Sequence, residues 1–149
     1  MTRRIMIATM LLGGTLLGQG RKPTITVFKD PSCTCCDKWI QHLMKSGFDV
    51  VVKEVGSAEL RQVKGRYGIP PALQSCHTGI VDGYVIEGHV PAAEVQRLLK
   101  ERPKNVGLVV PGMPTGSPGM EGQKNEAYSV LALDSAGRTS IFRTYPASR

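Results

Sequence analysis

The chain has 149 residues, of which 41% are hydrophobic, so it is long enough to form one domain with its own core. It carries 19 Lys and Arg residues against 12 Asp and Glu residues, for a formal net charge of +7 at pH 7. The basic residues are scattered, and only three Phe, four Tyr and one Trp could stack on bases, which argues against nucleic-acid binding.

The N-terminal segment has the pattern of a targeting sequence. Arg3 and Arg4 precede an apolar run at residues 5–17 that contains two adjacent glycines. The run is too short and too glycine-rich for a convincing membrane span, and it favours a secretory signal peptide. Because no clear cleavage site follows, an uncleaved N-terminal anchor remains the alternative for residues 1–20. We expect no contact with a membrane beyond that anchor.

The first half of the remaining chain alternates strand and helix patterns. Residues 24–28 are β-branched or aromatic and predict a strand. Apolar residues at helical spacing within 39–44 then predict a helix. A valine-rich second strand follows at 48–55, and a second helix is expected at 58–67, with Ser57 as its N-cap.

The second half begins with two short strands, expected at 77–81 and 84–87, and a helix at 91–101. The predicted order to this point is β-α-β-α-β-β-α. Residues 107–122 are rich in proline and glycine and contain two methionines, so we expect a structured loop there. A C-terminal β-hairpin is expected at 126–145.

Three of the four cysteines, Cys33, Cys35 and Cys36, fall within four residues. Cysteines placed this closely either oxidise or bind a soft metal. Cys33 and Cys36 have the C-x-x-C spacing of thioredoxin-type redox pairs, where a strand gives way to a helix. The helix N-terminus favours a thiolate, so Cys33 is expected to be the most reactive sulfur.

The element order and the Gly-Ile-Pro step around Pro70 fit a single thioredoxin-like α/β domain over residues 21–149. By position, Pro70 is the candidate for the proline that thioredoxin-like proteins hold in cis beside the active-site cysteines, although most X-Pro bonds are trans. In that interpretation Cys33 and Cys36 are the catalytic redox pair.

Cys35 does not fit a plain dithiol site, because a third thiol next to the pair needs a partner of its own. Cys76 is such a partner, and the histidine beside it adds an imidazole. Thiolates, imidazoles and thioethers all suit Cu(I), and adjacent cysteines fit structural zinc poorly. The candidate metal ligands are Cys33, Cys35, Cys36, Cys76 and His77, with His89, Met113 and Met120 as further candidates.

Several motifs together resemble the CopG-type copper-resistance family, a group of small exported bacterial proteins with a C-x-C-C motif that was long catalogued as a domain of unknown function. The resemblance covers roughly residues 24–122, and the motifs that carry it lie at 29–36, 75–78, 82–91, 110–114 and 116–121. It implies a thioredoxin-like fold, a copper-binding cysteine cluster, a periplasmic location and a role in copper redox handling alongside efflux proteins.

The leading hypothesis is therefore an exported periplasmic protein that holds Cu(I), with several ions sharing bridging thiolates. Its partners would be copper ions and other periplasmic copper-handling or efflux proteins, and it would give copper tolerance by sequestration or redox handling. One alternative is a thiol-disulfide oxidoreductase in which Cys33 attacks and Cys36 resolves. Another is a non-catalytic interaction module stapled by disulfides, for example Cys33–Cys36 and Cys35–Cys76.

Other conspicuous residues have simpler interpretations. Trp39 is expected to anchor the core behind the cysteine loop, and Met44 is expected to lie in the core. We expect His42 to be half-buried or on the surface, and Lys29 and Asp30 to be solvated. Met113 and Met120 could equally be apolar plugs that pin their loop to the domain.

Overall fold

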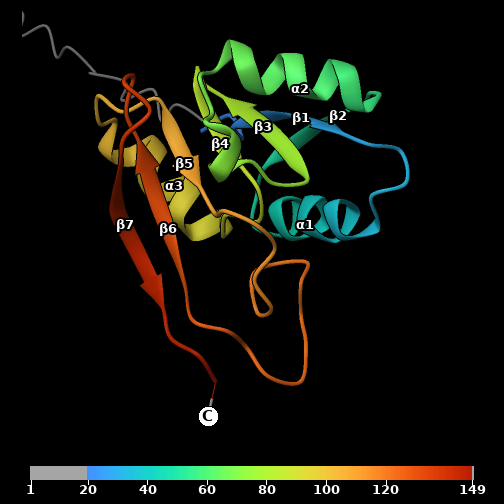
Figure 1. Ribbon diagram of the computed structural model, residues 1–149, viewed down its shortest axis with the longest axis vertical. Helices are drawn as coiled ribbons and strands as arrows, with labels where there is room; N and C mark the ends of the chain where they lie inside the picture. The colour runs from blue at the N-terminus through green and yellow to red at the C-terminus, as the bar shows by residue number, and fades with distance from the viewer. Residues whose placement is uncertain (1–19, 149) are drawn as a thin grey trace, which may run out of the picture.

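The computed structural model describes residues 20–148, and within them the chain forms a single mixed α/β domain around one seven-stranded sheet. The strands are β1 (Thr24–Lys29), β2 (Asp49–Glu54), β3 (His77–Val81), β4 (Tyr84–Glu87), β5 (Gly107–Val109), β6 (Tyr128–Leu133) and β7 (Thr139–Tyr145). The helices are α1 (Thr34–Lys45), α2 (Ser57–Arg66) and α3 (Ala92–Glu101), with a 3-10 turn η1 (Pro71–Leu73). Helix α2 covers one face of the sheet, and α1 and α3 lie on the other (Figure 1). The targeting segment falls almost wholly outside the described residues.

The strand order across the sheet is β2-β1-β3-β4-β5-β6-β7. β1 pairs in parallel with β2, and α1 supplies the crossover that parallel strands need. β1 also pairs antiparallel with β3, which places Lys29 opposite His77. β3 and β4 form a tight hairpin at Asp82 and Gly83, both with positive φ, as an Asp-Gly turn favours. Within the described residues, no helix is long and apolar enough to cross a membrane.

The main core lies between the sheet and the face that α1 and α3 present to it. Trp39 is fully buried there, and its indole N–H donates to the Val90 carbonyl at 2.8 Å. The expectation that Trp39 anchors the core is therefore confirmed. A smaller cluster on the α2 side contains Ile69, Val85, Val109 and Leu133.

Two expectations for the helices are wrong. Met44 is 57% exposed, because the buried stripe of α1 consists of Cys36, Trp39, Ile40 and Leu43 and Met44 lies outside it. Ser57 is the first residue of α2 and not its N-cap; the N-cap is Gly56, and no side chain caps that end.

Lys29 was expected in solvent but is only 1% exposed. It is the last residue of β1, and its ammonium lies 3.1 Å from Asp37 and 3.5 Å from Glu54, which are themselves exposed. The long apolar stem is therefore buried while the charge reaches carboxylates at the surface.

β5 was not predicted, because its three residues fall within the loop expected at 107–122. It lies between β4 and β6 and so joins the C-terminal hairpin to the sheet. A Cβ at Gly107 would come within 1.8 Å of the Val85 carbonyl oxygen, so only glycine permits this close approach.

The predicted hairpin is present as β6 and β7, and it is fastened to α3. The ring of Tyr145 stacks on Tyr128 at a centroid distance of 4.9 Å, and its hydroxyl donates to Glu94 at 2.9 Å. The guanidinium of Arg97 lies 4.0 Å from the centroid of the Phe142 ring. The hairpin is thus part of the domain.

His42 is half-buried and stabilises the start of α3. The N-cap residue Pro91 has no capping side chain, and the Ala92 N–H instead donates to His42 Nε2 at 3.0 Å. Burial lowers the pKa of His42, partly offset by the nearby Glu121 carboxylate. The neutral imidazole is therefore the form that caps this helix.

We predict that His42→Ala lowers the free energy of unfolding by about 1 kcal/mol at about pH 7.5, the usual effect of losing a helix cap. A lowered folded pKa means that the unfolded chain binds the proton more readily, so this stability is lost as the pH falls below about 6.5. The difference between variant and wild type should therefore shrink on acidification, as measured by urea unfolding. Gln41→Ala, at an exposed site on the same helix, is the control and should change neither the free energy of unfolding nor its pH dependence. A His42→Ala effect that does not vary with pH would contradict the capping role.

Candidate metal centre

The four cysteines meet at one edge of the sheet. Cys33 is the N-cap of α1, and Cys35 and Cys36 belong to its first turn. Cys76 directly precedes β3, which runs beside β1. The four Sγ atoms all lie within 4.8 Å of one another, with Cys35 3.5 Å from Cys33 and 4.0 Å from Cys76. The β1–β3 pairing thus joins cysteines that are distant in the sequence.

Cys33 and Cys36 form a disulfide, whereas Cys35 and Cys76 are free thiols. The second disulfide of the stapled alternative, Cys35–Cys76, is not formed. In this oxidised state two sulfurs remain available as ligands, and reduction of the disulfide would supply two more.

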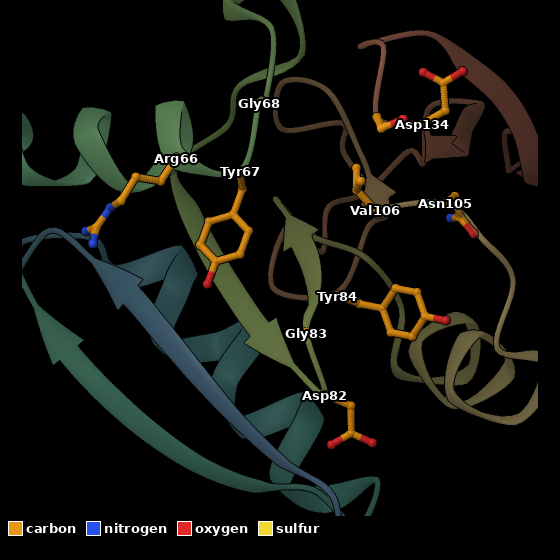
Figure 2. A pocket seen from close by; sticks show the side chains of 10 residues that line it. Arg66, Tyr67, Gly68, Asp82, Gly83, Tyr84, Asn105, Val106 and Asp134 are labelled. Atoms are coloured by element: carbon orange, nitrogen blue, oxygen red, sulfur yellow. The ribbon is translucent and has the colours of Figure 1, made fainter.

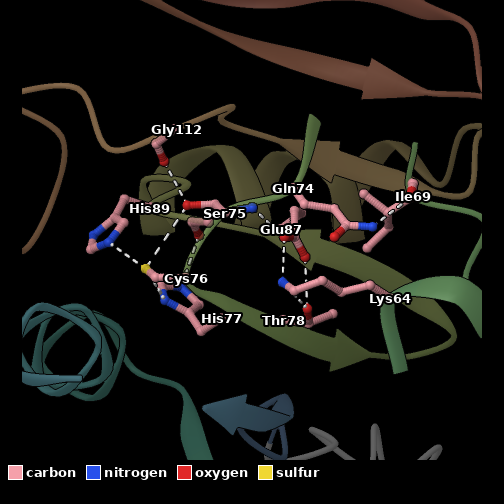
Figure 3. A network of polar contacts seen from close by, with 11 residues as sticks. Lys64, Ile69, Gln74, Ser75, Cys76, His77, Thr78, Glu87, His89 and Gly112 are labelled. Atoms are coloured by element: carbon pink, nitrogen blue, oxygen red, sulfur yellow. Dashed lines mark hydrogen bonds and ion pairs between the residues drawn. The ribbon is translucent and has the colours of Figure 1, made fainter. Parts of the chain in front are cut away.

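Two histidines flank Cys76, as Figure 3 shows. Its Sγ lies 3.3 Å from His77 Nδ1 and 3.1 Å from His89 Nε2. The other ring nitrogens face backbone carbonyls: His77 Nε2 is 3.0 Å from the Gly88 oxygen, and His89 Nδ1 is 2.7 Å from the Pro118 oxygen. Because a carbonyl can only accept, these outer nitrogens carry the protons. The inner nitrogens therefore present lone pairs toward the sulfur.

Burial keeps these groups uncharged in the absence of a metal. It lowers the pKa of His77 well below its usual value, with smaller contributions from His89 and Lys64, and it also lowers the pKa of His89. Burial, together with the neighbouring Cys35, raises the pKa of the Cys76 thiol to about 12. A metal binding here would have to displace the thiol proton, but the imidazoles are already in their ligating form.

The donors form two groups that share Cys76: the four cysteines, and Cys76 with His77 and His89. Thiolates and neutral imidazoles are soft to borderline ligands, which suit Cu(I). The arrangement therefore fits a soft metal. His89 is 13 residues from Cys76 in the sequence, and the fold brings it into the site.

The loop expected at 107–122 crosses the start of α1. A Cβ at Gly119 would lie 2.8 Å from the Cys35 carbonyl oxygen and 3.0 Å from the Trp39 nitrogen, so this loop packs directly on the cysteine turn. Met120 follows Gly119 and is partly buried, whereas Met113 is 50% exposed. The structure thus brings the backbone around Met120 to the site, and both methionines remain predicted ligands.

The expectation of a cis bond at Pro70 is not met. The bonds of the described residues are all trans, and Pro70 instead precedes the 3-10 turn η1. A Cβ at Gly137 would lie 3.4 Å from the Pro70 ring, which places this proline at the β6–β7 turn. The residue that faces the cysteine loop just before β3 is Cys76.

A cavity of about 500 Å³ lies elsewhere, among the end of α2, the β3–β4 turn and the β6–β7 turn (Figure 2). Its lining includes Tyr67, Tyr84 and Asp134, and none of the candidate ligands. This cavity is therefore separate from the candidate metal ligands.

Sequence reasoning missed the residues that support the ligands. In the sequence, Lys64 is one of many scattered lysines that are expected at the surface, yet it is buried against Glu87. Glu87 carried a usable signal, since a carboxylate in an otherwise apolar strand is rarely buried without a partner. The Pro118 carbonyl, which orients His89, left no sequence signal.

Comparisons with known proteins give matches to a family model and to solved structures. The family model described as "Protein of unknown function, DUF411" matches residues 73–120. Two solved chains, named "Copper resistance protein copG- Form 2" and "Copper resistance protein copG- Form 1", are 46% and 45% identical to this chain, and both align with a TM-score of 0.78. Each alignment covers 85% of this chain and 100% or 99% of the other. None of the curated proteins compared with the chain matches it.

We predict that Gly119→Ala destabilises the protein more than Gly112→Ala. Both glycines have positive φ, +89° and +67°, so alanine strains either backbone by about 1 kcal/mol or more. Only at Gly119 would the added Cβ also press on the Cys35 carbonyl and come within 3.3 Å of His89 Nδ1. Thermal unfolding should show the larger loss for Gly119→Ala, and NMR should show a shift of the His89 N–H signal in that variant alone. Equal effects of the two changes would contradict the tight packing of the loop.

Proposed function

The chain belongs to the CopG family of copper resistance proteins, and from this premise we propose that it binds copper through its cysteine and histidine cluster and so contributes to copper tolerance. The observation that carries the proposal is the position of Cys76. Its sulfur lies between the inner nitrogens of two histidines and within 4.8 Å of three other cysteine sulfurs.

The donor chemistry favours Cu(I). Sulfur ligands stabilise the softer, reduced ion, and the two buried imidazoles add neutral donors at no cost in proton release. Cys35 and Cys36 are adjacent in the chain, so all four sulfurs cannot comfortably ligate a single ion. Several copper ions that share bridging thiolates fit the cluster better.

Copper binding and redox state are coupled in this proposal. The disulfide between Cys33 and Cys36 removes two thiolates from the donor set. Two electrons and two protons convert it to two thiols, which release their protons when copper binds. The reduced protein should hold more copper than the oxidised protein, and tolerance would follow from sequestration or from copper redox handling.

We further propose that the frame is thioredoxin-like and that the protein acts in the periplasm. The parallel β1–β2 pair with a C-x-x-C segment at the start of α1 supports the first proposal. The apolar run at residues 5–17 and the presence of a disulfide support the second, since disulfides persist in oxidising compartments. Other periplasmic copper-handling or efflux proteins are the proposed partners.

A second candidate function is thiol-disulfide exchange. It is favoured by the disulfide in a C-x-x-C segment at a helix N-terminus, with Cys33 partly exposed and Cys36 buried. In that reaction a substrate thiolate attacks Cys33, and Cys36 leaves as the thiolate.

We predict that anaerobically reduced protein binds Cu(I) tightly and that Cys76→Ser weakens this binding by more than about 100-fold, because the change removes the sulfur shared by both donor groups. Titration against a chromogenic Cu(I) chelator measures the affinity, and X-ray absorption identifies sulfur and nitrogen neighbours. His42→Ala is the control, because His42 lies outside the cluster, and it should bind as wild type does. Equal binding by wild type and Cys76→Ser would remove the proposal.

For the second candidate, we predict little turnover of a mixed-disulfide substrate when a strong copper chelator is present, because the redox pair serves copper binding. The assay compares wild type with Cys33→Ser at equal concentration. Multiple turnovers by chelated wild type, lost in Cys33→Ser, would favour the oxidoreductase instead.

A further inference from the structure

A buried ion pair lies behind Cys76, and none of the proposed ligands belongs to it. Lys64 on α2 and Glu87 on β4 are 4% and 0% exposed, and their charged atoms are 2.5 Å apart. A buried pair of this kind often adds no more stability than apolar residues of similar size, because both charges lose their hydration. Fold stability alone therefore does not explain its presence.

Both carboxylate oxygens of Glu87 accept hydrogen bonds. Oε1 accepts from Lys64 and, at 2.6 Å, from the backbone N–H of Ser75. Oε2 accepts from the Thr78 hydroxyl at 2.7 Å, and that hydroxyl also accepts from Lys64 at 3.0 Å. Figure 3 shows the carboxylate held between α2 and the segment that carries Cys76. The network fixes the carboxylate in one position.

We propose that Lys64 and Glu87 are positioning residues for copper, an inference that rests on the proposed copper function. Ser75 and Cys76 lie in irregular chain before β3, where no strand pairing holds them. The Glu87 carboxylate holds the Ser75 N–H and thereby sets where the sulfur of Cys76 lies. That sulfur is 3.1 Å from His89 and 3.3 Å from His77, so a displacement of about 1 Å would spoil the donor geometry.

Ser75 also connects the loop at residues 107–122 to the Glu87 carboxylate. The Ser75 hydroxyl donates to the Gly112 carbonyl at 2.5 Å, one residue before Met113. A Cβ at Gly88 would lie 2.8 Å from the Ser75 Cβ and 2.5 Å from the Val110 oxygen, so the two chain segments are in close contact. Helix α2, which offers no ligand, is in this way mechanically linked to the metal site through one lysine.

The test separates the ion pair from the hydrogen bond it supports. Lys64→Met combined with Glu87→Leu removes both charges together, so no unpaired charge stays buried, but Ser75 loses its acceptor. Lys64→Met combined with Glu87→Gln also removes both charges, yet it retains an amide oxygen for Ser75. Leu98→Ala, in the core of α3 away from Ser75, provides a control for general loss of stability.

We expect the Leu double variant to bind Cu(I) about 10- to 100-fold more weakly, the usual effect of losing a residue that orients a ligand, and the Gln double variant to recover most of the affinity. In metal-free protein, alkylation of Cys76 by iodoacetamide should accelerate several-fold in the Leu variant and remain slow in the Gln variant. Mass spectrometry of the labelled peptides gives the rates. Ser75→Pro, which removes the N–H and the hydroxyl but leaves the ion pair intact, should reproduce the Leu variant, whereas Ser75→Ala, which removes the hydroxyl alone, should not.

Wild-type affinity and alkylation in both the Leu variant and Ser75→Pro would overturn the positioning role. So would a loss of affinity that Leu98→Ala matches at equal thermal stability, because the effect would then be structural. If wild type binds no Cu(I), the proposed copper function fails, and the alkylation rates alone decide whether the pair positions Cys76.

Discussion

The antiparallel pairing of β1 with β3 is the constraint on which the site depends. The chain leaves β1 directly into the cysteine turn of α1, and it enters β3 directly from Cys76. Because Lys29 lies opposite His77, the exit of one strand and the entry of the other meet at one edge of the sheet. Cys35 and Cys76, 41 residues apart in sequence, are thereby brought to 4.0 Å. A slip of the register by one residue would turn Cys76 toward the opposite face of the sheet and dismantle the cluster.

Backbone groups, more than charged side chains, prepare the histidines. The carbonyls of Gly88 and Pro118 hold the outer ring nitrogens and so aim the inner ones at Cys76. Burial lowers the pKa of both rings and so favours their neutral form, because a buried imidazolium would lose its hydration. The loop that carries Pro118 can reach His89 only because Gly119 has no side chain. The proline- and glycine-rich loop at residues 107–122 therefore helps to orient His89.

The disulfide and the proposed copper cluster draw on the same sulfurs, so each limits the other. In the oxidised protein, two thiols and two imidazoles remain, while in the reduced protein four thiols are available. Cys36 is buried and Cys33 is partly exposed, so a reductant reaches the disulfide through Cys33. Cys33, Cys35 and Cys36 lie at the start of α1, and Cys76 directly precedes β3, so both states draw on the same two chain segments. The Lys64–Glu87 pair connects the segment before β3 to α2, because Glu87 also accepts from the Ser75 N–H.

Local patterns in the sequence were sufficient for most of the helices and strands and for recognising a cluster of sulfur ligands. Strand and helix periodicity located nearly every element, and the C-x-C-C turn identified a sulfur site, because such signals depend only on near neighbours. β5 escaped because three residues give no periodicity, and Ser57 was misplaced by one position because caps shift at helix ends. The tertiary structure alone decided that Lys29 is buried, that Met44 is exposed, that Pro70 lies at the β6–β7 turn, and that His89 reaches Cys76. It also decided that Lys64 meets Glu87. These facts arise from contacts between residues far apart in the chain, and no local pattern of residues specifies such contacts.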